Sequence, residues 1–304
     1  MRLREAVVSK GIVLSVMASV LFGVMYYFTS LLKPLDGEEI FGWRMLLTLP
    51  CMTLFMLFSG DWKLIVGIFQ RLRPQPWLIA GLLLSSVLVG VQLWLFMWAP
   101  LNGRSLDVSL GYFLLPLTMV LTGRLVYGER LSRLQTIAAL LACCGVLNEL
   151  YRVGSFSWAT LLVAIGYPIY FVLRRRCGTD HLGGLWLDMV LLLPAAWWFA
   201  LHGPQGGLNV LAHTPSLYFL IPLLGVISAS ALVCYILASR LLAFSLFGLL
   251  SYVEPVLLVG VALLLGESIG PGEWLTYLPI WLAVGVLVLE GARHLLGQRR
   301  RKLM

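Results

Sequence analysis

Two prolines stand inside long apolar stretches of this sequence, each a few residues after a tyrosine. Tyr112 precedes Pro116, and Tyr252 precedes Pro255. A proline has no backbone N–H, so it leaves a carbonyl oxygen without its helical partner one turn upstream. In apolar surroundings that carbonyl must be satisfied by water, a polar side chain or a ligand. The pattern predicts helix breaks that line a cavity; packing kinks between closely approaching helices are the alternative.

Glu254 is the most deeply placed acidic residue, the ninth of the apolar stretch that begins at Leu246. A charged side chain at the centre of a bilayer costs about 2.5 to 3.5 kcal/mol, so it faces a protein interior or water. Burial favours the protonated carboxyl, and a neighbouring cation favours the carboxylate. Two interpretations stay open. Glu254 exchanges a proton during a functional cycle, or it is a permanently protonated structural residue.

Three further charged residues lie near the ends of apolar stretches: Arg44, Asp107 and Asp188. Arg44 either snorkels to the membrane surface with Glu39 as its partner or orients an anionic or zwitterionic solute at a cavity mouth. Asp107 and Asp188 are expected in the first turns of helices, where a carboxylate complements the positive end of the helix dipole. We interpret both as helix caps, with solute binding as the alternative.

Aromatic side chains gather near the end of the apolar stretch Trp77 to Ala99. Helical spacing places Gln92 and Phe96 on one face, and Trp94 and Trp98 on roughly the opposite face. One of these pairs is expected to line a cavity, and either suits an amphipathic organic solute. An ion pore would instead be built from rings of carbonyls or charges.

The elements that must position these residues are membrane-spanning helices. The chain of 304 residues is 60% hydrophobic and 12% charged, whereas soluble domains carry roughly a quarter charged residues. Apolar runs long enough to cross a hydrocarbon core of about 30 Å follow one another with short connections. We expect ten spans: Gly11 to Leu32, Ile40 to Ser59, Trp77 to Ala99, Leu106 to Val126, Leu134 to Leu150, Ser157 to Leu173, Leu185 to Leu201, Ser216 to Ser239, Leu246 to Gly266 and Trp274 to Gly291. The first is too long for the apolar region of a signal peptide and lacks a small-residue cleavage site, so we expect it to be retained.

The basic residues predict the orientation of the chain. If the N-terminus is cytoplasmic and the sides alternate, 18 of the 22 Lys and Arg residues fall on the inner side or at the adjoining helix ends. The positive-inside rule then places both termini in the cytoplasm. We attribute the net charge of +8 to topology and to membrane lipids rather than to nucleic acid.

Several features recur in the same order in the two halves of the chain. They are Tyr112, Pro116 and Gly128-Glu129 against Tyr252, Pro255 and Gly266-Glu267; Glu149 and Arg152 against Glu290 and Arg293; and Arg44 against Asp188. We expect residues 1–152 and 153–304 to form two five-helix repeats. Because five is odd, the second repeat enters the membrane from the opposite side. The predicted fold is an all-α integral membrane protein of ten transmembrane helices, arranged as two inverted repeats around a central cavity.

Cysteines and histidines indicate no metal or cofactor site. The five cysteines show no C-x-x-C spacing, and the four histidines are scattered in loops and at one helix end. Buried cysteines in spans serve as small packing residues, and a zinc site needs several such ligands close together. We therefore expect neither a metal nor a cofactor.

At this point the residues resemble a known family, the RarD-type permeases of the EamA branch of the drug/metabolite transporter superfamily. The resemblance rests on Trp94-Leu-Phe-Met-Trp98-Ala99, Asn102, Ser109-Leu-Gly-Tyr-Phe113, Pro116-Leu117, Gly128-Glu129-Arg130, and Glu39 with Arg44. It extends over essentially all ten spans. It implies a multi-pass transporter of the bacterial inner membrane that exports metabolites or drugs. The family offers no invariant catalytic constellation to carry over to this chain.

Functions from other classes are weaker interpretations. An integral membrane enzyme would expose clustered carboxylates or histidines in its interfacial loops, and no nucleotide-binding loop of the G-x-x-x-x-G-K type is present. A channel or lipid scramblase is the remaining competitor. The resemblance also leaves a dedicated exporter of an opine-type metallophore as an alternative to a general metabolite or drug exporter. The sequence does not specify the solute, the driving gradient or the oligomeric state.

Overall fold

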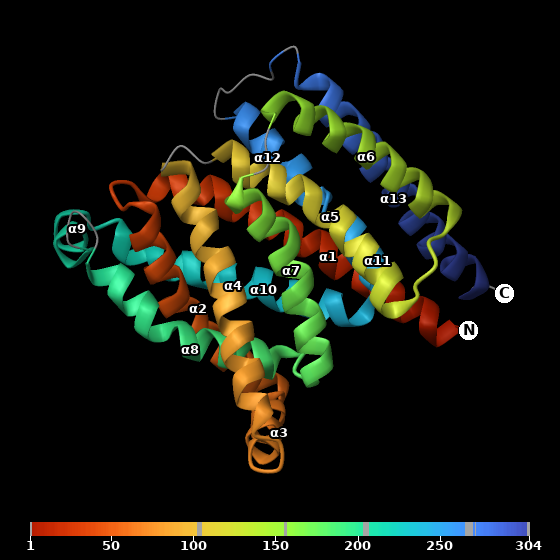
Figure 1. The fold of residues 1–304 in the computed structure, drawn as a ribbon. Helices are drawn as coiled ribbons and strands as arrows, with labels where there is room; N and C mark the ends of the chain where they lie inside the picture. The colour runs from red at the N-terminus through yellow and green to blue at the C-terminus, as the bar shows by residue number, and fades with distance from the viewer. Residues whose placement is uncertain are drawn as a thin grey trace. The chain divides into compact units, whose positions relative to one another are not determined.

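The computed structural model describes residues 2–101, 105–154, 157–202, 207–264, 270 and 272–302, and these residues form helices and connecting turns. Figure 1 shows the helices as labelled here. They are α1 (Arg2–Thr29), a short 3-10 turn (Ser30–Leu32), α2 (Gly37–Ser59), α3 (Trp62–Leu72), α4 (Trp77–Leu101), α5 (Ser105–Tyr127), α6 (Arg133–Val153), α7 (Trp158–Cys177), α8 (Leu182–Leu201), α9 (Gly207–His213), α10 (Leu217–Leu241), α11 (Phe244–Leu250), α12 (Val253–Leu264) and α13 (Trp274–Lys302).

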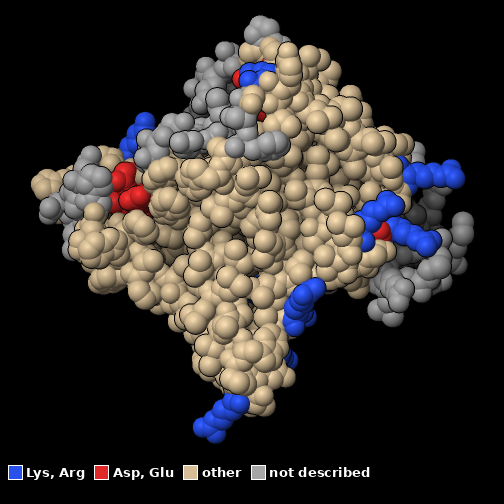
Figure 2. All heavy atoms as spheres, in the orientation of Figure 1, with Lys and Arg blue, Asp and Glu red and all other residues tan. Residues whose placement is uncertain are grey.

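Most of these helices have the length and apolar composition needed to cross a membrane. Seven stretches of the described residues qualify: Val7–Phe28, Gly37–Ser59, Trp77–Phe96, Leu110–Tyr127, Arg133–Arg152, Leu182–Leu201 and Leu217–Leu241. Two shorter apolar stretches, Phe244–Leu257 and Trp274–Glu290, fall where the ninth and tenth spans are expected. Three arginines occupy the last turn of α7, which shortens its apolar part. The face drawn in Figure 2 is accordingly uncharged over most of its area. The all-α membrane fold is confirmed, while the count of ten spans stays a prediction.

The helices group into two compact units, and each unit takes residues from both halves of the chain. Unit 1 comprises residues 1–23, 109–168 and 237–304, and unit 2 comprises residues 24–108 and 169–236. These units therefore do not coincide with the two consecutive repeats expected over residues 1–152 and 153–304, which remain a prediction about internal duplication.

Within unit 1, α6 and α13 pack closely and run in opposite directions. The start of α6 meets the middle of α13, because the hydroxyl of Ser132 donates to the Glu290 carboxylate at 2.8 Å. The end of α6 meets the start of α13, because the amide of Asn148 donates to the hydroxyl of Thr276 at 2.9 Å. Gly145 lies against the backbone of Thr276 with no room for a side chain. Figure 1 shows the two helices side by side.

Within unit 2, α2 and α8 make the corresponding antiparallel pair. Gly42 near the start of α2 packs against the backbone of Ala196 and Ala200 near the end of α8. At the other end, the indole Nε1 of Trp186 donates to the hydroxyl of Thr53 at 2.8 Å. Small residues at a crossing let helix backbones approach closely where the lipid supplies no hydrophobic driving force.

Two helices, α3 and α9, lie in segments that the sequence analysis left between expected spans. α3 is a short amphipathic helix in the segment that we assigned to the inner connection between the second and third spans. Its Ile65 and Ile68, three residues apart, are buried, and its Trp62 ring meets the Trp186 ring edge-on at 5.4 Å. Arg71 near its end donates to the carbonyl oxygen of Cys177 at 2.7 Å. The basic residues of this segment thus lie on an ordered helix that packs against α8.

Candidate functional site

The ninth expected span is interrupted in the structure. α11 ends at Leu250, Ser251 and Tyr252 form a turn, and α12 begins at Val253. Pro255 lies in the first turn of α12, where a proline is tolerated because the first N–H groups have no partner within the helix. The carbonyl oxygen of Ser251, which a helical residue 255 would have bound, accepts instead from the N–H of Glu254 at 3.2 Å. A discontinuous helix therefore stands where the proline predicted one.

The fourth expected span behaves differently. α5 runs without interruption from Ser105 to Tyr127 and contains Pro116 in its interior. The predicted break at Pro116 is therefore wrong. α5 stays helical there and lacks only the hydrogen bond that an N–H at position 116 would have donated. The side chain of Tyr112, one turn before this proline, is half-buried, and its ring lies 6.3 Å from that of Tyr167.

The two proline-bearing helices contact one another inside unit 1. The hydroxyl of Tyr252, at the turn between α11 and α12, donates to the carbonyl oxygen of Phe113 in α5 at 2.9 Å, and the Tyr252 side chain is fully buried. Gly248 of α11 packs so closely on α5 that an added Cβ would lie 2.4 Å from the Cβ of Met119 and 3.3 Å from the carbonyl oxygen of Pro116. The interrupted helix thus contacts α5 on both sides of Pro116, at Phe113 and at Met119.

Glu254 begins α12 on the far side of this turn. It occupies the first helical turn, where a carboxylate complements the positive end of the helix dipole. Its side chain is partly buried. Glu254 therefore lies directly at the discontinuity, beside the backbone groups that the break rearranges.

Glu129 is a functional contact that the sequence analysis missed. It was named in the sequence analysis only as part of the recurring Gly-Glu pair and of the family resemblance, but its carboxylate reaches α11 of the same unit. It accepts from the backbone N–H of Phe244 and of Ser245, each at 2.7 Å. The residue before α11, Ala243, has no side chain that can cap a helix. Glu129 therefore caps α11 from another helix, and the uncapped apolar start at Ala243 was the available signal. The matching Gly266-Glu267 lies outside the described residues.

Asp188 of unit 2 is a buried ion-pair partner, so its interpretation as a helix cap was wrong. α8 begins at Leu182 rather than at the expected Leu185, which places Asp188 in the second turn. Its carboxylate accepts from the guanidinium of Arg174 at 2.5 Å and from the hydroxyl of Ser85 at 2.6 Å. The hydroxyl of Tyr170 completes the set at 3.1 Å.

Arg174 is one of the 18 basic residues expected on the inner side or at the adjoining helix ends, yet only 1% of its side chain is exposed. Besides Asp188, its guanidinium donates to the carbonyl oxygens of Thr179 and His181, which lie in the turn between α7 and α8. Its two neighbours, Arg175 and Arg176, are more exposed. Of the three consecutive arginines, Arg174 is therefore structural and the other two lie nearer the surface. This distinction depends on the position of α8.

Arg44 is buried as well, which excludes snorkelling to the surface. Its side chain is 1% exposed, and its Nε donates to the hydroxyl of Ser228 in α10 at 2.9 Å. Glu39, the partner expected for it, accepts from the N–H of Asp36 at 3.1 Å in a capping box at the start of α2. Arg44 thus ties α2 to α10 inside unit 2.

The aromatic segment of α4 keeps its two predicted faces. The rings of Trp94 and Trp98 stack at 5.0 Å between centroids. Gln92 is buried, and Phe96 meets Tyr26 edge-on at 6.3 Å. The indole Nε1 of Trp94 is buried without a hydrogen-bond acceptor among the described residues. The side chain of Asp107 lies outside the part that the structure describes.

Comparison with known proteins identifies the family. The chain is 45% identical over 293 residues to the chloramphenicol-sensitive protein RarD of Pseudomonas aeruginosa, a match that covers 96% of this chain and 98% of the relative. The chain belongs to the RarD-type permeases. An uncharacterized transporter of Pasteurella multocida is 42% identical over 96% of this chain and 99% of its own length, and protein RarD of Escherichia coli K12 is 29% identical over 92% and 94%.

Two further comparisons agree with this assignment. The model of the EamA-like transporter family matches residues 9–148 of this RarD-type permease. The crystal structure of a protein with 18% sequence identity superposes with a TM-score of 0.66 over 94% of this chain and 98% of that chain, which shows a shared fold. A RarD-type permease is a membrane transporter, so the chain is not an enzyme. Among the described residues no group of His, Cys, Asp or Glu side chains has the arrangement of a metal site.

Proposed function

We propose that this RarD-type permease is a secondary transporter that exports a small organic metabolite or drug-like solute across the bacterial inner membrane by alternating access. The observation that carries the proposal is the discontinuous helix α11–α12 with Glu254 at its break. In secondary transporters, interrupted helices expose backbone groups and helix ends to solute and coupling ions within the membrane. The relatives that share the family are named as transporters or as RarD, without a solute established for this chain.

The contacts between α6 and α13 support the inverted repeats that this mechanism requires. Gln135 and Thr276 lie 141 residues apart, and so do Glu149 and Glu290. The amide of Gln135 donates to Glu290 at 3.4 Å, and the hydroxyl of Thr276 donates to Glu149 at 2.9 Å. Equivalent residues thus exchange partners, as a twofold axis demands. Because the helices are antiparallel, this axis is perpendicular to them, which is the relation expected of inverted repeats in a membrane.

The α2–α8 pair of unit 2 follows the same rule with a separation of 144 residues. Gly42 lies 144 residues before Trp186, and Thr53 lies 144 residues before Trp197. Gly42 packs on Ala196, the neighbour of Trp197, while Thr53 accepts from Trp186. Strict symmetry would pair Gly42 with Trp197. The observed contact with Ala196 differs from this by one residue. Two independent helix pairs therefore support a duplication with residues 1–152 and 153–304 as its halves.

Within this proposal the candidate residues take different roles. Glu254 is the coupling residue that gains and loses a proton, because its carboxyl lies at the break between α11 and α12. Trp94 and Trp98 bind the apolar part of the solute, and the buried Nε1 of Trp94 offers it a donor. Asp188 and Arg44 position helices, because each already has a buried partner.

A flux measurement in proteoliposomes tests the proposal. The purified chain would be reconstituted, a pH gradient imposed, and radiolabelled chloramphenicol and tryptophan used as probes; chloramphenicol appears in the name of the Pseudomonas aeruginosa relative. We expect saturable uptake driven by the gradient for at least one probe. Glu254→Gln should abolish gradient-driven accumulation and leave solute exchange intact, whereas Glu38→Gln, at a surface acid of α2, should change neither.

The two parts of the proposal fail separately. Absence of both gradient-driven uptake and exchange for amphipathic solutes, in vesicles that contain folded protein, would contradict the assignment as a solute exporter. Gradient-driven uptake that survives Glu254→Gln unchanged would remove the coupling role from Glu254 and leave the transporter assignment in place.

A further inference from the structure

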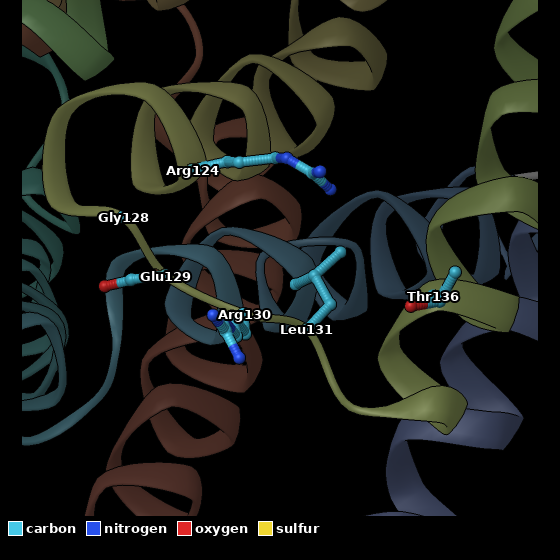
Figure 3. Close-up of a pocket in the computed structure, with 6 residues that line it drawn as sticks. All are labelled: Arg124, Gly128, Glu129, Arg130, Leu131 and Thr136. Atoms are coloured by element: carbon cyan, nitrogen blue, oxygen red, sulfur yellow. The ribbon is translucent and has the colours of Figure 1, made fainter.

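A basic pocket opens in unit 1 where α5 ends and α6 begins. Its volume is about 470 Å³, and it is lined by Arg124, Gly128, Glu129, Arg130, Leu131 and Thr136 (Figure 3). Figure 2 shows Lys and Arg side chains gathered at this end of the two helices. The pocket lining contains none of the candidate transport residues named above, and the carboxylate of Glu129 is bound to the start of α11.

The pocket is built by the way α5 terminates. Gly128 adopts a left-handed backbone conformation with φ of +64°, and the N–H of Glu129 donates to the carbonyl oxygen of Gly123 at 3.1 Å. The N–H of Gly128 itself donates to the carbonyl oxygen of Arg124 at 3.2 Å. A left-handed glycine with this bond ends a helix and turns the chain away from its axis. Ser132 then caps α6, because its hydroxyl accepts from the N–H of Gln135 at 3.0 Å. The extended residues between the two caps leave a concave surface between the helix ends.

The charge of this concave surface is positive. Arg124 and Arg130 are exposed and have no hydrogen bond or ion pair with any residue that the structure describes. Glu129 is the single acid of the lining, and its two carboxylate oxygens accept hydrogen bonds from the backbone N–H groups of Phe244 and Ser245. Figure 3 shows Glu129 extending toward α11, while Arg124 extends toward the side on which Thr136 lies. The two guanidinium groups are therefore available to an anion.

Exposed apolar side chains flank the pocket on both helices. Leu121, three residues before Arg124, is 55% exposed, and Leu140, four residues after Thr136, is 63% exposed. Residues three or four apart lie on the same face of a helix, so each polar lining residue continues into an apolar stripe that runs along its helix. A soluble anion makes no contact with such stripes, whereas the acyl chains of a lipid pack against them.

We propose that this pocket binds the phosphate head group of an anionic phospholipid, with its acyl chains along α5 and α6. Arg124 and Arg130 hold the phosphate, and the leucine stripes receive the chains. Basic pockets between membrane helices bind anionic head groups in this manner. The proposal rests on the geometry of unit 1 alone and is independent of the solute and of proton coupling.

Native mass spectrometry of the detergent-purified full chain, titrated with phosphatidylglycerol or phosphatidylcholine, tests this site. We expect phosphatidylglycerol to bind more tightly than phosphatidylcholine. Each arginine near a membrane surface strengthens such binding about fivefold, so Arg124→Ala/Arg130→Ala should weaken phosphatidylglycerol binding about 25-fold. The control Arg73→Ala/Arg176→Ala removes the same charge from exposed positions outside the pocket and should weaken binding no more than about twofold. Both double variants should retain the size-exclusion profile and melting temperature of the parent chain in neutral lipid.

Three results would overturn the proposal. If both double variants weaken phosphatidylglycerol binding equally, the preference is a property of the net charge and not of the pocket. If inorganic phosphate or glycerol phosphate at millimolar concentration displaces phosphatidylglycerol from the parent chain, the pocket holds a soluble anion and the leucine stripes contribute nothing. If Arg124→Ala/Arg130→Ala retains both its phosphatidylglycerol binding and its melting temperature, the lipid does not bind at this pocket.

Discussion

The guanidinium of Arg174 and the carboxylate of Asp188 meet at 2.5 Å, with 1% and 0% of their side chains exposed. This ion pair joins the last turn of α7 to the second turn of α8, and the hydroxyls of Tyr170 and Ser85 complete the coordination of the carboxylate. Because the carboxylate is satisfied on both oxygens, the pair acts as a fixed link between helices in unit 2.

Breaking this pair from one side should be costly. Removing one partner of a buried ion pair leaves an uncompensated charge and costs about 3 to 5 kcal/mol. We expect Asp188→Leu to lower the free energy of unfolding by that amount, and Arg174→Met/Asp188→Leu to restore most of it. Chemical or thermal unfolding in detergent, followed by circular dichroism, measures this. Arg176→Ala, two residues away and exposed, should be neutral; equal losses in the single and double variants would contradict the assignment.

Glu129 should matter through the start of α11. A missing helix cap costs about 0.5 to 2 kcal/mol, and here one side chain serves two N–H groups. We expect Glu129→Ala to destabilise the chain at the upper end of that range and to increase hydrogen exchange at Phe244 and Ser245. Glu129→Gln keeps one acceptor oxygen, so its stability and its hydrogen exchange should lie between those of the parent chain and of Glu129→Ala. An exchange pattern identical to that of Glu38→Gln would show that the cap is dispensable.

The close approach of α5 and α11 should not tolerate a methyl group. At Gly248 a new Cβ would meet the Cβ of Met119 at 2.4 Å, whereas at Gly260 of α12 it would meet nothing within 4 Å. Overpacking of this kind costs about 1 to 3 kcal/mol. We expect Gly248→Ala to lower the melting temperature and the rate of solute exchange in proteoliposomes. Gly260→Ala should preserve both; equal behaviour of the two variants would show that α5 and α11 separate freely at this point.

Chemical cross-linking should reveal the exchange of partners between α6 and α13. In a cysteine-free background, Gln135→Cys/Glu290→Cys and Glu149→Cys/Thr276→Cys should both be joined by a short bis-maleimide, since their parent side chains are hydrogen-bonded. The mismatched pair Gln135→Cys/Thr276→Cys places both thiols at opposite ends of antiparallel helices and should not react. Cross-linking of the mismatched pair, detected by the shift on a denaturing gel, would contradict the antiparallel register.

Several features of this protein followed from the sequence because they depend on residues close together in the chain. The apolar spans depend on runs of consecutive residues, since a helix must cover the hydrocarbon core with side chains that lipid accepts. The break near Pro255 depends on a missing N–H and one turn of backbone. The resemblance to the family rested on short motifs between Trp94 and Arg130 and on Glu39 with Arg44, and the relatives confirm the family. The expectation of a repeat likewise rested on spacing along the chain, and it stays a prediction.

Which polar groups bind one another was decided only by the tertiary structure. Arg174 looks like any cytoplasmic arginine until α8 packs beside α7 and begins three residues earlier than expected. Glu129 looks like a helix end until α11 presents two N–H groups to it, and Pro116 looks like a break until α5 proves continuous. In a low-dielectric interior a charge is stable only beside a partner. That partner lies on another helix, 14 residues away for Arg174 and 115 for Glu129, so no local pattern in the chain specifies it.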